Sequence, residues 1–421
     1  MYWSDLNNKT IGIWGMGREG LSARAAIESH CSNSCISEIS ESDLSVLDKC
    51  DILIKSPGVS LYRPEIQNLI RRGIPVISGT NLFFANRPDN AKIIAVTGTK
   101  GKSTTSSLLA HTLKTLGQRV LLGGNIGRPL LDFVDEPADL IVAELSSYQC
   151  ADFVGQPDIG ILVNLYPEHL QWHGSHDRYY ADKFNMIRQC HQKILNGSDP
   201  RTRDLAAGLS ATWFNHATGF HLEQDGFYRG RDRLFGRSDL NLVGDHNAEN
   251  ACAVLTAVAL LGFNPIDCQT AFRTFSALPH RLQTIGQKDG ITYVDDSIST
   301  TPETAVAALK ALYCGQKIVL IAGGLDRGQD YTVLLDCLAE HPDDLYLVTL
   351  PDTGTRLCAQ AQNRHLRVSP TSDMPTAVDM ARHLLPAGGI VILSPAAPSY
   401  NLYRNFEERG ADFARWALSD P

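Results

Sequence analysis

The chain has 421 residues, of which 43% are hydrophobic, and this length exceeds one compact core, so several domains are expected, with three as the central estimate. A formal net charge of −8 provides no broad basic surface for DNA or for an anionic membrane, which excludes nucleic-acid binding as the expected function. No apolar run reaches the roughly 20 residues that span a bilayer, and the polar N-terminal stretch does not resemble a signal peptide, so a cytoplasmic protein without membrane insertion is expected.

Short apolar strands alternate with helical stretches in the first 88 residues. The strands are expected at 11–14, 52–54 and 75–77, and the helices at 21–29 and 64–72. This rhythm is typical of a parallel sheet. Proline and asparagine in the polar stretch 86–90 interrupt both periodicities, so a domain boundary is predicted after residue 88.

A glycine-rich turn, Gly15-Met16-Gly17-Arg18-Glu19-Gly20, follows the first strand and opens a helix. In that context, backbone N–H groups and the helix N-terminus can meet a phosphate. One interpretation is an NAD site, with Glu38 near the end of the next strand as the ribose ligand, and the other is a turn that needs glycine only for packing. The motif alone leaves both interpretations open.

A sharper motif, Thr97-Gly98-Thr99-Lys100-Gly101-Lys102-Ser103-Thr104, follows the strand expected at 93–96. Backbone donors can wrap the β- and γ-phosphates of a nucleotide, Lys102 supplies a positive charge, and the Ser103 hydroxyl can ligate Mg²⁺. Gly98 lies three residues before Gly101, where the usual P-loop has a spacing of five, which indicates a distinct ATPase family. A solvent-exposed turn has no need of this combination ahead of an apolar helix.

Polar side chains follow the next two apolar strands, expected at 139–143 and 159–164. Glu144 stands at a strand end, where a magnesium ligand is expected in an α/β sheet, although it could instead cap the following helix. His169 and Lys183 come after the second strand. Residue chemistry alone favours a structural role for His169 and a solvent-exposed Lys183, because histidine is not a usual magnesium ligand and lysine is a cation.

The remaining chain predicts a small insert, one buried helix and a third α/β segment. The insert at 203–242 is rich in Gly, Asp and Arg and suggests hairpins, and the apolar run 251–263 predicts the helix. After residue 278, strands are expected at 291–294, 317–322, 345–350 and 389–393. The ten cysteines lack a repeated CxxC pair and are expected to be buried free thiols.

Six motifs occur in the order found in Mur ligases. They are Thr97 to Thr104 as given above, Gly124-Asn125-Ile126-Gly127, Glu144-Leu145-Ser146-Ser147-Tyr148-Gln149, Glu168-His169-Leu170, Gly244-Asp245-His246-Asn247-Ala248-Glu249-Asn250 and Pro279-His280-Arg281-Leu282. The chain resembles that family from end to end. The resemblance implies three consecutive α/β domains: a Rossmann-like UDP-binding domain (1–88), a P-loop ATPase-like central domain (89–277) and a Rossmann-like C-terminal domain (278–421).

The chain also resembles one branch of that family, which adds glutamate to UDP-N-acetylmuramoyl-L-alanine in peptidoglycan precursor synthesis. The stretches that carry this resemblance are Ser56-Pro57-Gly58, Leu393-Ser394-Pro395-Ala396-Ala397-Pro398-Ser399 and Asn405-Phe406-Glu407-Glu408-Arg409-Gly410. The implied reaction is an ATP-dependent, ADP-forming ligation through an acyl phosphate. The resemblance assigns the first glycine loop to UDP instead of NAD, which removes Glu38 from consideration.

The resemblance implies roles for individual residues. Catalysis would involve Lys102, Glu144, His169 and Lys183. Two Mg²⁺ ions would be held by Ser103, Glu144, His169 and a CO₂-derived carbamate on Lys183, which turns the lysine cation into an oxygen-donor anion. ATP would contact Gly98, Thr99, Lys100, Gly101, Lys102, Ser103, Thr104, Asn247, Asn250, Arg281 and Asp296. The UDP substrate would contact Gly15, Met16, Gly17, Arg18, Ser56, Pro57, Gly58 and Asn125, and glutamate would contact Thr300, Arg327, Ser399 and Phe406.

Three positions depart from the usual pattern of that branch. Ile298 and Arg327 each stand where a lysine is common, and Glu168 stands where aspartate is usual. Arginine is not a neutral exchange for lysine, because its planar fork grips a carboxylate from a different distance. This pattern resembles an L-glutamate-adding subgroup more than the D-glutamate enzymes, and D-glutamate remains the alternative.

Rival functions come from other classes. An NAD-dependent oxidoreductase leaves the loop at 98–104 without a role, and a non-catalytic nucleotide-binding partner subunit does not explain Lys102, Glu144, His169 and Lys183. Glutamate addition to folate is disfavoured by the N-terminal Rossmann-like segment, which a UDP-sugar would need. The expected partners are UDP-N-acetylmuramoyl-L-alanine and glutamate, and the expected oligomeric state is a monomer.

Overall fold

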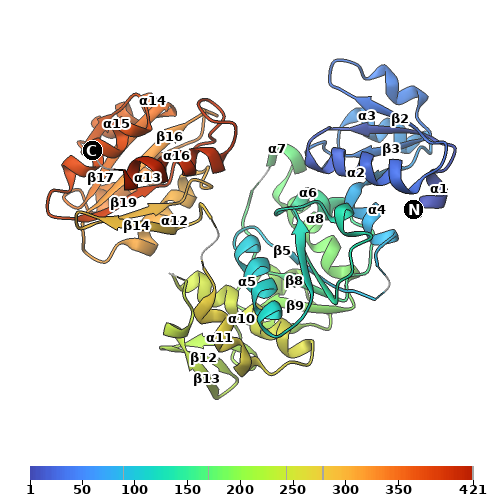
Figure 1. Cartoon of the computed structure of the whole chain (residues 1–421), viewed down its shortest axis with the longest axis horizontal. Coiled ribbons are helices and arrows are strands. Elements are labelled where there is room, and N and C mark those ends of the chain that lie inside the picture. The colour runs from blue at the N-terminus through green and yellow to red at the C-terminus, as the bar shows by residue number, and fades with distance from the viewer. Residues whose placement is uncertain (89, 169, 243, 277–278, 420–421) are drawn as a thin grey trace. The chain divides into compact units, whose positions relative to one another are not determined.

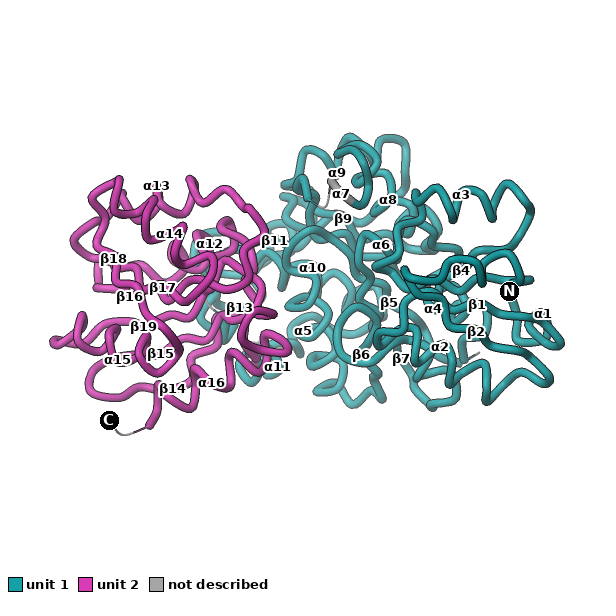
Figure 2. The backbone as a smooth tube through the Cα atoms, turned by 90° about the horizontal axis from the view of Figure 1, so that it is seen from above, with its two compact units in different colours: residues 1–275 teal, residues 276–421 magenta. Residues whose placement is uncertain are grey.

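The computed structural model describes residues 1–88, 90–168, 170–242, 244–276 and 279–419 (Figure 1). The chain forms two compact units, unit 1 (Met1–Phe275) and unit 2 (Ser276–Pro421), which have separate colours in Figure 2. Both units contain largely parallel sheets whose strands alternate with helices along the chain, so the predicted α/β class is confirmed.

The first sheet of unit 1 has four parallel strands in the order β2-β1-β3-β4. The strands are β1 (Thr10–Trp14), β2 (Cys35–Ile39), β3 (Ile52–Lys55) and β4 (Val76–Ser78). The helices of this segment are α1 (Trp3–Leu6), α2 (Arg18–His30), the 3₁₀ turn η1 (Ser45–Lys49), α3 (Pro64–Arg71) and α4 (Gly79–Ala85). The predicted strands and helices are confirmed, with bounds shifted by one to three residues.

The second sheet of unit 1 has six parallel strands in the order β10-β9-β8-β5-β7-β6. The strands are β5 (Lys92–Thr97), β6 (Val120–Gly124), β7 (Leu140–Glu144), β8 (Ile159–Leu162), β9 (Gln192–Asn196) and β10 (Thr212–Phe214). Residues 93–96 of β5 are fully buried, as expected for a central parallel strand covered on both faces. The loop after β5 therefore emerges at the carboxyl edge of the sheet, where α/β proteins bind ligands.

Helices and a small third sheet complete unit 1. They are α5 (Lys102–Thr115), η2 (Leu130–Phe133), α6 (Ser147–Ala151), α7 (Leu170–His173), α8 (His176–Gln189), α9 (Pro200–Leu205), η3 (Arg237–Asp239), α10 (Asp245–Leu260), η4 (Pro265–Asp267) and α11 (Cys268–Thr274). The third sheet is an antiparallel meander of β11 (Phe220–Glu223), β12 (Gly226–Arg229) and β13 (Asp232–Gly236), which confirms the hairpin-rich insert. The predicted buried helix corresponds to α10, whose residues 250–258 are all buried.

Unit 2 contains one six-stranded sheet in the order β14-β15-β19-β16-β17-β18. The strands are β14 (Gln283–Lys288), β15 (Ile291–Asp295), β16 (Ile318–Gly324), β17 (Leu345–Asp352), β18 (Val368–Pro370) and β19 (Gly389–Leu393). Its helices are α12 (Pro302–Leu312), α13 (Thr332–Glu340), α14 (Thr353–Gln362), α15 (Met374–Leu384) and α16 (Phe406–Leu418). The four predicted strands are confirmed.

Strand β14 was not predicted, and its pairing with β15 is the only antiparallel pair of this sheet among the described residues. It joins β15 through a hairpin at Asp289 and Gly290, both of which have positive φ. A two-residue Asp-Gly connection between strand-like stretches favours such a hairpin, so the signal was present in the sequence.

Both predicted domain boundaries stay predictions. Residue 88 falls inside unit 1, between its first and second sheets, and residues 89, 277 and 278 lie outside the described residues. One hydrophobic cluster includes Ile13 of β1 and Ile93 of β5, and α2 and α4 pack against η2. The two sheets of unit 1 therefore share buried contacts.

All ten cysteines are free thiols, as predicted, but they are not all buried. Seven are buried, Cys31 is half-buried, and Cys35 and Cys314 are exposed. The prediction of burial was wrong for those three: Cys31 is the C-cap of α2, Cys35 begins an edge strand, and Cys314 follows the end of α12. No helix among the described residues has the length and apolar character needed to cross a membrane.

Candidate active site

The loop between β5 and α5 carries the strongest predicted motif. Gly101 is the N-cap of α5 and has a φ of +78°, a conformation that favours glycine. A Cβ atom at Gly101 would lie 2.7 Å from Nδ2 of Asn250, so the loop packs against the amide of that residue on α10. Asn247 lies three residues earlier, in the first turn of the same helix. The structure therefore brings the α10 asparagines and the loop into one region.

Lys102 begins α5 and folds back over the loop. Its Nζ atom donates hydrogen bonds to the carbonyl oxygens of Gly98 at 3.0 Å and Thr99 at 2.9 Å. The first turn of α5, which includes half-buried Ser103, presents backbone N–H groups and the positive end of the helix dipole at the same place. A cation and several backbone donors in one place suit the binding of a polyphosphate.

Lys183 on α8 reaches the same carbonyl as Lys102. Its side chain is 2% exposed, and its Nζ atom donates to the Gly98 oxygen at 2.7 Å. Burial, reinforced by the charge of Lys102, lowers the pKa of Lys183 to about 7. The expectation from residue chemistry alone, a solvent-exposed Lys183, is therefore wrong. A large share of this amine is neutral and nucleophilic near neutral pH.

Glu144 is the last residue of β7 and is 1% exposed. Its Oε1 atom accepts a hydrogen bond from Nδ2 of Asn125 at 2.7 Å. In the described part of the chain, its Oε2 atom is buried and has no hydrogen-bond partner. Such an oxygen costs free energy unless a cation or donor satisfies it, and Mg²⁺ prefers carboxylate oxygens. Glu144 therefore fits a magnesium ligand.

The backbone of the loop is braced by side chains from the segment after β8. Lys100 forms an ion pair with Glu168, and its backbone N–H donates to Oδ1 of Asn164 at 2.9 Å. The hydroxyl of Thr99 lies 2.8 Å from that of Tyr179. Glu168, which departs from the usual pattern, thus meets a predicted ATP residue. His169 lies outside the described residues.

A chain of buried polar groups lies beside this region and was missed by the sequence reasoning. The two ring nitrogens of His173 contact Oδ2 of Asp182 at 2.6 Å and Oγ of Ser147 at 3.0 Å. Asp182 precedes Lys183 on α8, and Ser147 begins α6 shortly after Glu144. The only sequence signal was proximity to the motifs. The network links the elements that carry Glu144 and Lys183.

The first glycine loop follows β1, and its fold depends on glycine at two positions. The Ser56 hydroxyl donates to the carbonyl oxygen of Gly15, whose φ is +95°. A Cβ atom at Gly20 would lie 2.1 Å from that same oxygen, so α2 approaches the turn too closely for any side chain. Arg18 donates to the carbonyl oxygen of Gly127 at 3.0 Å. The loop therefore contacts the segment that carries Asn125.

The other predicted UDP residues lie in the loops after β1 and β3, next to Gly15 and Ser56 in the sequence. Met16 packs against the core, Pro57 is half-buried, and Gly58 is exposed. Glu19 of α2, which was not predicted as a site residue, accepts a hydrogen bond at its Oε1 atom from Nε2 of Gln149 on α6 at 3.3 Å. Burial raises the pKa of Glu19 to about 7.

Unit 2 carries two predicted ATP residues, Arg281 and Asp296. Asp296 is buried, and its carboxylate accepts hydrogen bonds from the Ser394 hydroxyl at 2.7 Å and the Leu282 N–H at 3.2 Å. Burial raises the pKa of Asp296 to about 6, and the charge of Arg281 acts in the opposite direction. Arg281 is half-buried, and its Nε atom is buried without a hydrogen-bond partner among the described residues.

The predicted glutamate residues gather at the carboxyl edge of the unit 2 sheet. Thr300 follows β15, Arg327 follows β16 and Ser399 follows β19, and these three strands are neighbours. Phe406 begins α16, and its carbonyl oxygen accepts from the Ser297 hydroxyl at 2.8 Å. Arg327 is exposed, Thr300 is half-buried and Ser399 is buried. Three loops and one helix start therefore meet at this edge.

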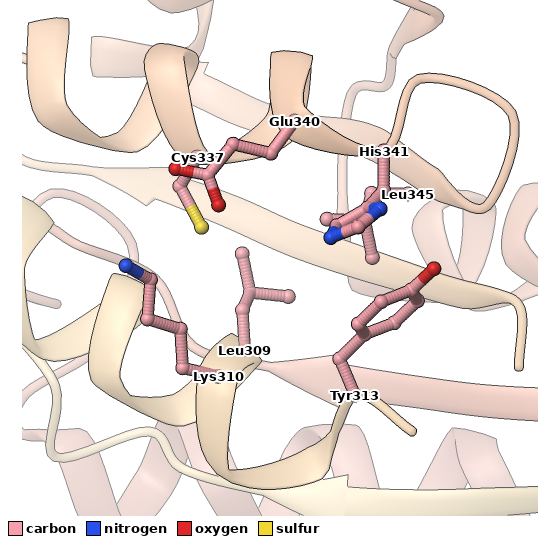
Figure 3. Close-up of a pocket in the computed structure, with 7 residues that line it drawn as sticks. All are labelled: Leu309, Lys310, Tyr313, Cys337, Glu340, His341 and Leu345. Carbon is pink, nitrogen blue, oxygen red and sulfur yellow. The ribbon is translucent and has the colours of Figure 1, made fainter. Parts of the chain in front are cut away.

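Unit 2 also has a small pocket, which is not lined by the predicted glutamate residues (Figure 3). It lies between the ends of α12 and α13 and the start of β17, whereas the predicted glutamate residues follow the carboxyl ends of their strands. No predicted site residue lines it. Its lining residues are Leu309, Lys310, Tyr313, Cys337, Glu340, His341 and Leu345.

Comparison with known proteins gives matches along the whole chain. Residues 96–258 match the Mur ligase middle domain, and residues 280–397 match the Mur ligase glutamate ligase domain. A protein of Xanthomonas euvesicatoria pv. vesicatoria named UDP-N-acetylmuramoyl-L-alanine--L-glutamate ligase is 39% identical over 460 residues, covering 99% of this chain and 97% of the relative. A Salinispora tropica protein of the same name is 38% identical over 450 residues, covering 99% and 98%.

Solved structures of lower identity share the fold. The UDP-N-acetylmuramate-alanine ligase of Thermotoga maritima superposes with a TM-score of 0.63 at 20% identity, covering 96% of this chain and 98% of that one. The folylpolyglutamate synthase of Mycobacterium tuberculosis, complexed with ADP, gives a TM-score of 0.62 at 15% identity, covering 79% and 91%.

Proposed function

The chain belongs to the Mur ligase family, and on that premise we propose that it joins L-glutamate to UDP-N-acetylmuramoyl-L-alanine. It is an ATP-dependent, ADP-forming acid–amino-acid ligase of peptidoglycan synthesis. The identity of each site residue, the carbamate and the stereochemistry of glutamate are the parts that we propose.

The observation that carries the proposal is the meeting of two lysines and a carboxylate at the loop after β5. Lys102 and Lys183 both donate to the Gly98 carbonyl oxygen, at 3.0 and 2.7 Å. Glu144 pairs with Val96 across the β5–β7 ladder, so its unsatisfied oxygen lies near the start of the same loop. This arrangement suits a nucleotide triphosphate with bound magnesium.

The first chemical step transfers the γ-phosphoryl group of ATP to the alanyl carboxylate, which gives an acyl phosphate and ADP. Lys102 and the N-terminus of α5 would neutralise charge that develops on the phosphoryl oxygens. Ser103 and Glu144 would hold one Mg²⁺, and His169 and modified Lys183 a second. Bound magnesium would withdraw charge from the phosphate oxygens. The protein then mainly positions the two reactants.

We propose that Lys183 carries the carbamate in the active enzyme. Its neutral amine would attack CO₂, forming an N–C bond and releasing one proton, and the product is an anion with two oxygen donors. Burial supports this reaction because it lowers the pKa of the amine to about 7. An anion at this position also compensates the charge of Lys102.

In the second step, the amine of glutamate attacks the acyl carbon, and inorganic phosphate leaves as the amide bond forms. Thr300, Arg327, Ser399 and the start of α16 at Phe406 would receive the carboxylates of glutamate. Arg327 is exposed and carries a long, planar cation suited to bidentate contact with a carboxylate. Ile298 is half-buried and offers no cation.

The preference for L-glutamate is supported by those two positions and by the names of the relatives. The amine must point at the acyl phosphate in both enantiomers. Inversion of the α-carbon therefore places one carboxylate at a different position in the pocket. A cation at Arg327 and none at Ile298 favour one placement over the other. The alternative, in which Ile298 only packs and D-glutamate is the substrate, predicts the opposite enantiomer preference.

One assay tests the proposed function. Phosphate release is measured with ATP, UDP-N-acetylmuramoyl-L-alanine and each glutamate enantiomer separately. We expect release that requires all three substrates and is faster with L-glutamate. Release that is independent of the UDP substrate, or absent with both enantiomers, contradicts the function. A monomeric state and a cytoplasmic location stay predictions.

A further inference from the structure

The side chain of Arg409 lies in the interior of unit 2. This residue is in the first turn of α16 and is 1% exposed, which makes it one of the largest fully buried side chains of the chain. A buried arginine is unusual, because removing a guanidinium from water is costly unless its donors and its charge are compensated.

Three hydrogen bonds from Arg409 join the segments that carry the predicted glutamate residues. Its Nε atom donates to the Ser297 hydroxyl at 3.1 Å, and its Nη2 atom donates to the Ser297 carbonyl oxygen at 2.8 Å. Its Nη1 atom donates to the Ala397 carbonyl oxygen at 3.0 Å. One side chain thus holds the loop that leads to Thr300 and the loop that leads to Ser399.

Two further contacts extend this arrangement. The Ser297 hydroxyl donates a hydrogen bond to the carbonyl oxygen of Phe406 at 2.8 Å, so the start of α16 is tied to the same point. At the end of β16, a Cβ atom on Gly324 would lie 3.0 Å from Nη1 of Arg409, so the strand that leads to Arg327 passes directly over the guanidinium. All four predicted glutamate residues therefore lie on segments that contact or are linked to Arg409.

The hydrogen bonds satisfy donors of Arg409 but not its charge. All of its acceptors are neutral oxygens, and among the described residues of unit 2 no carboxylate forms an ion pair with it. Asp295, whose charge acts on Arg409, is bound instead to Nδ1 of His280 at 2.7 Å. Burial lowers the pKa of Arg409 to about 10, which still leaves the guanidinium protonated at neutral pH.

A fixed cation without a carboxylate partner produces a positive potential at the loops above it, and this potential is weakly screened because the group is buried. This potential would favour binding of an amino acid whose side chain carries a carboxylate.

We infer that Arg409 is a positioning and specificity residue for the amino-acid substrate: it fixes the three loops, and its charge favours an amino acid with an anionic side chain over a neutral one. This inference rests on the proposed function, because it assumes that the segments after β15, β16 and β19 receive glutamate. It adds a residue that the sequence motifs contained without assigning it a role.

The alternative is that Arg409 only stabilises the fold, and Arg382 supplies a matched control. Arg382 on α15 also donates to backbone carbonyl oxygens, those of Trp416 at 2.8 Å, Ala417 at 3.1 Å and Ser419 at 3.1 Å. These lie at the far end of α16 from Arg409. Arg382→Met should lower the melting temperature of the protein without changing the choice of amino acid.

The test compares wild type with Arg409→Lys, Arg409→Met and Arg382→Met. The measured quantities are the KM values for ATP, UDP-N-acetylmuramoyl-L-alanine and glutamate, and the ratio of kcat/KM for glutamate to that for glutamine, which differs by a neutral amide. We expect Arg409→Met to raise the KM for glutamate and to lower the ratio about tenfold, which corresponds to about 1.4 kcal/mol. Arg409→Lys keeps the charge and should retain most of the ratio.

The outcomes separate this inference from the proposed function. Wild type without turnover on either glutamate enantiomer contradicts both. An active wild type whose glutamate-to-glutamine ratio is unchanged in Arg409→Met, or changed equally in Arg382→Met, contradicts only the role of Arg409. If Arg409→Met does not fold, Ser297→Ala tests the positional part, because it removes the hydroxyl that joins Arg409 to Phe406. The KM for glutamate should rise in Ser297→Ala while the KM for ATP stays the same, and an unchanged KM for glutamate overturns the inference.

Discussion

The hydroxyl of Tyr62 lies 2.7 and 2.8 Å from the two carboxylate oxygens of Asp182, which is 120 residues away in the sequence. Tyr62 follows β3 of the first sheet, and Asp182 precedes Lys183 on α8. The same carboxylate contacts His173 at 2.6 Å. This contact therefore connects the first sheet of unit 1 to the helix that carries the predicted carbamate.

We expect Tyr62→Phe to destabilise unit 1 while keeping its packing. The variant removes one hydrogen bond to a buried carboxylate, which costs about 1.5–3 kcal/mol. Urea unfolding followed by tryptophan fluorescence measures the change, because four of the five tryptophans lie in unit 1. Tyr313→Phe is the control. It removes a Tyr–Asp hydrogen bond between two half-buried side chains, to Asp344, and its effect should be smaller than loss of the bond to the buried Asp182. Equal losses in both variants contradict the prediction.

Lys102→Ala should reduce ATP-dependent ligation by at least about 100-fold and leave folding unchanged. Its Nζ atom donates hydrogen bonds to the carbonyl oxygens of Gly98 and Thr99 in the loop, so the core loses little. Phosphate release and circular dichroism measure the two effects. Lys114→Ala, at the exposed opposite end of α5, should behave as wild type. Near-normal turnover of Lys102→Ala would refute the assignment.

The proposed carbamate on Lys183 predicts a dependence on both CO₂ and pH. The reactive form is the neutral amine, and with a pKa near 7 its fraction increases as the pH rises from about 6 to 8. In buffer with limiting CO₂, activity should increase over that interval. Labelled CO₂ should give a carbamate signal in ¹³C NMR spectra of wild type.

Lys183→Ala should be inactive and partly recover when short-chain carboxylic acids are added, because these supply the missing oxygen donors. Full activity of Lys183→Ala in CO₂-depleted buffer rules this role out.

Glu144→Gln should separate activity from stability. The change keeps the acceptor for Asn125 and removes the charge of a buried carboxylate that has one unsatisfied oxygen, so the free energy of unfolding should rise, by up to about 3 kcal/mol. Ligation should fall, and titration of nucleotide binding with Mg²⁺ should require more of the ion. Glu136→Gln, which changes a half-buried surface carboxylate that forms an ion pair with Arg128, serves as the control. Unaltered magnesium dependence in Glu144→Gln contradicts its role as a ligand.

For the amino-acid substrate, we expect kcat/KM to be about tenfold to a hundredfold higher with L-glutamate than with D-glutamate. This range corresponds to loss of one charge-assisted contact, about 1.5–3 kcal/mol, by one enantiomer only. Ile298→Lys should reduce the preference by restoring a cation at the position that lacks one. A clear preference of wild type for D-glutamate contradicts this prediction.

The sequence predicted those features that depend on local patterns. The apolar run at 93–96 identifies a central strand, and the glycines after it identify the loop. Hydrophobic periodicity predicted the strand at 291–294. The Asp-Gly pair at 289 and 290 also favours a hairpin, which would place another strand before it. Strand bounds shifted by one or two residues because pairing between strands, and not composition, decides where a strand ends.

Contacts between distant segments could not be predicted in the same way. Arg409 donates a hydrogen bond to Ser297, which is 112 residues away in the sequence. Nothing near either residue indicates that the guanidinium is buried against this serine. The same holds for the burial of Lys183, which residue chemistry favoured as exposed. Such placements follow from how sheets and helices pack, which a single sequence does not specify locally.

The distribution of thiols gives the protein a built-in pair of labelling positions. Cys35 is exposed in unit 1 and Cys314 is exposed in unit 2, while seven of the other eight thiols are buried and the last is half-buried. A bulky maleimide dye should therefore react first at these two sites in the native protein. Energy transfer between a donor and an acceptor dye would then report substrate-dependent changes in the separation of the two units, with no residue replaced.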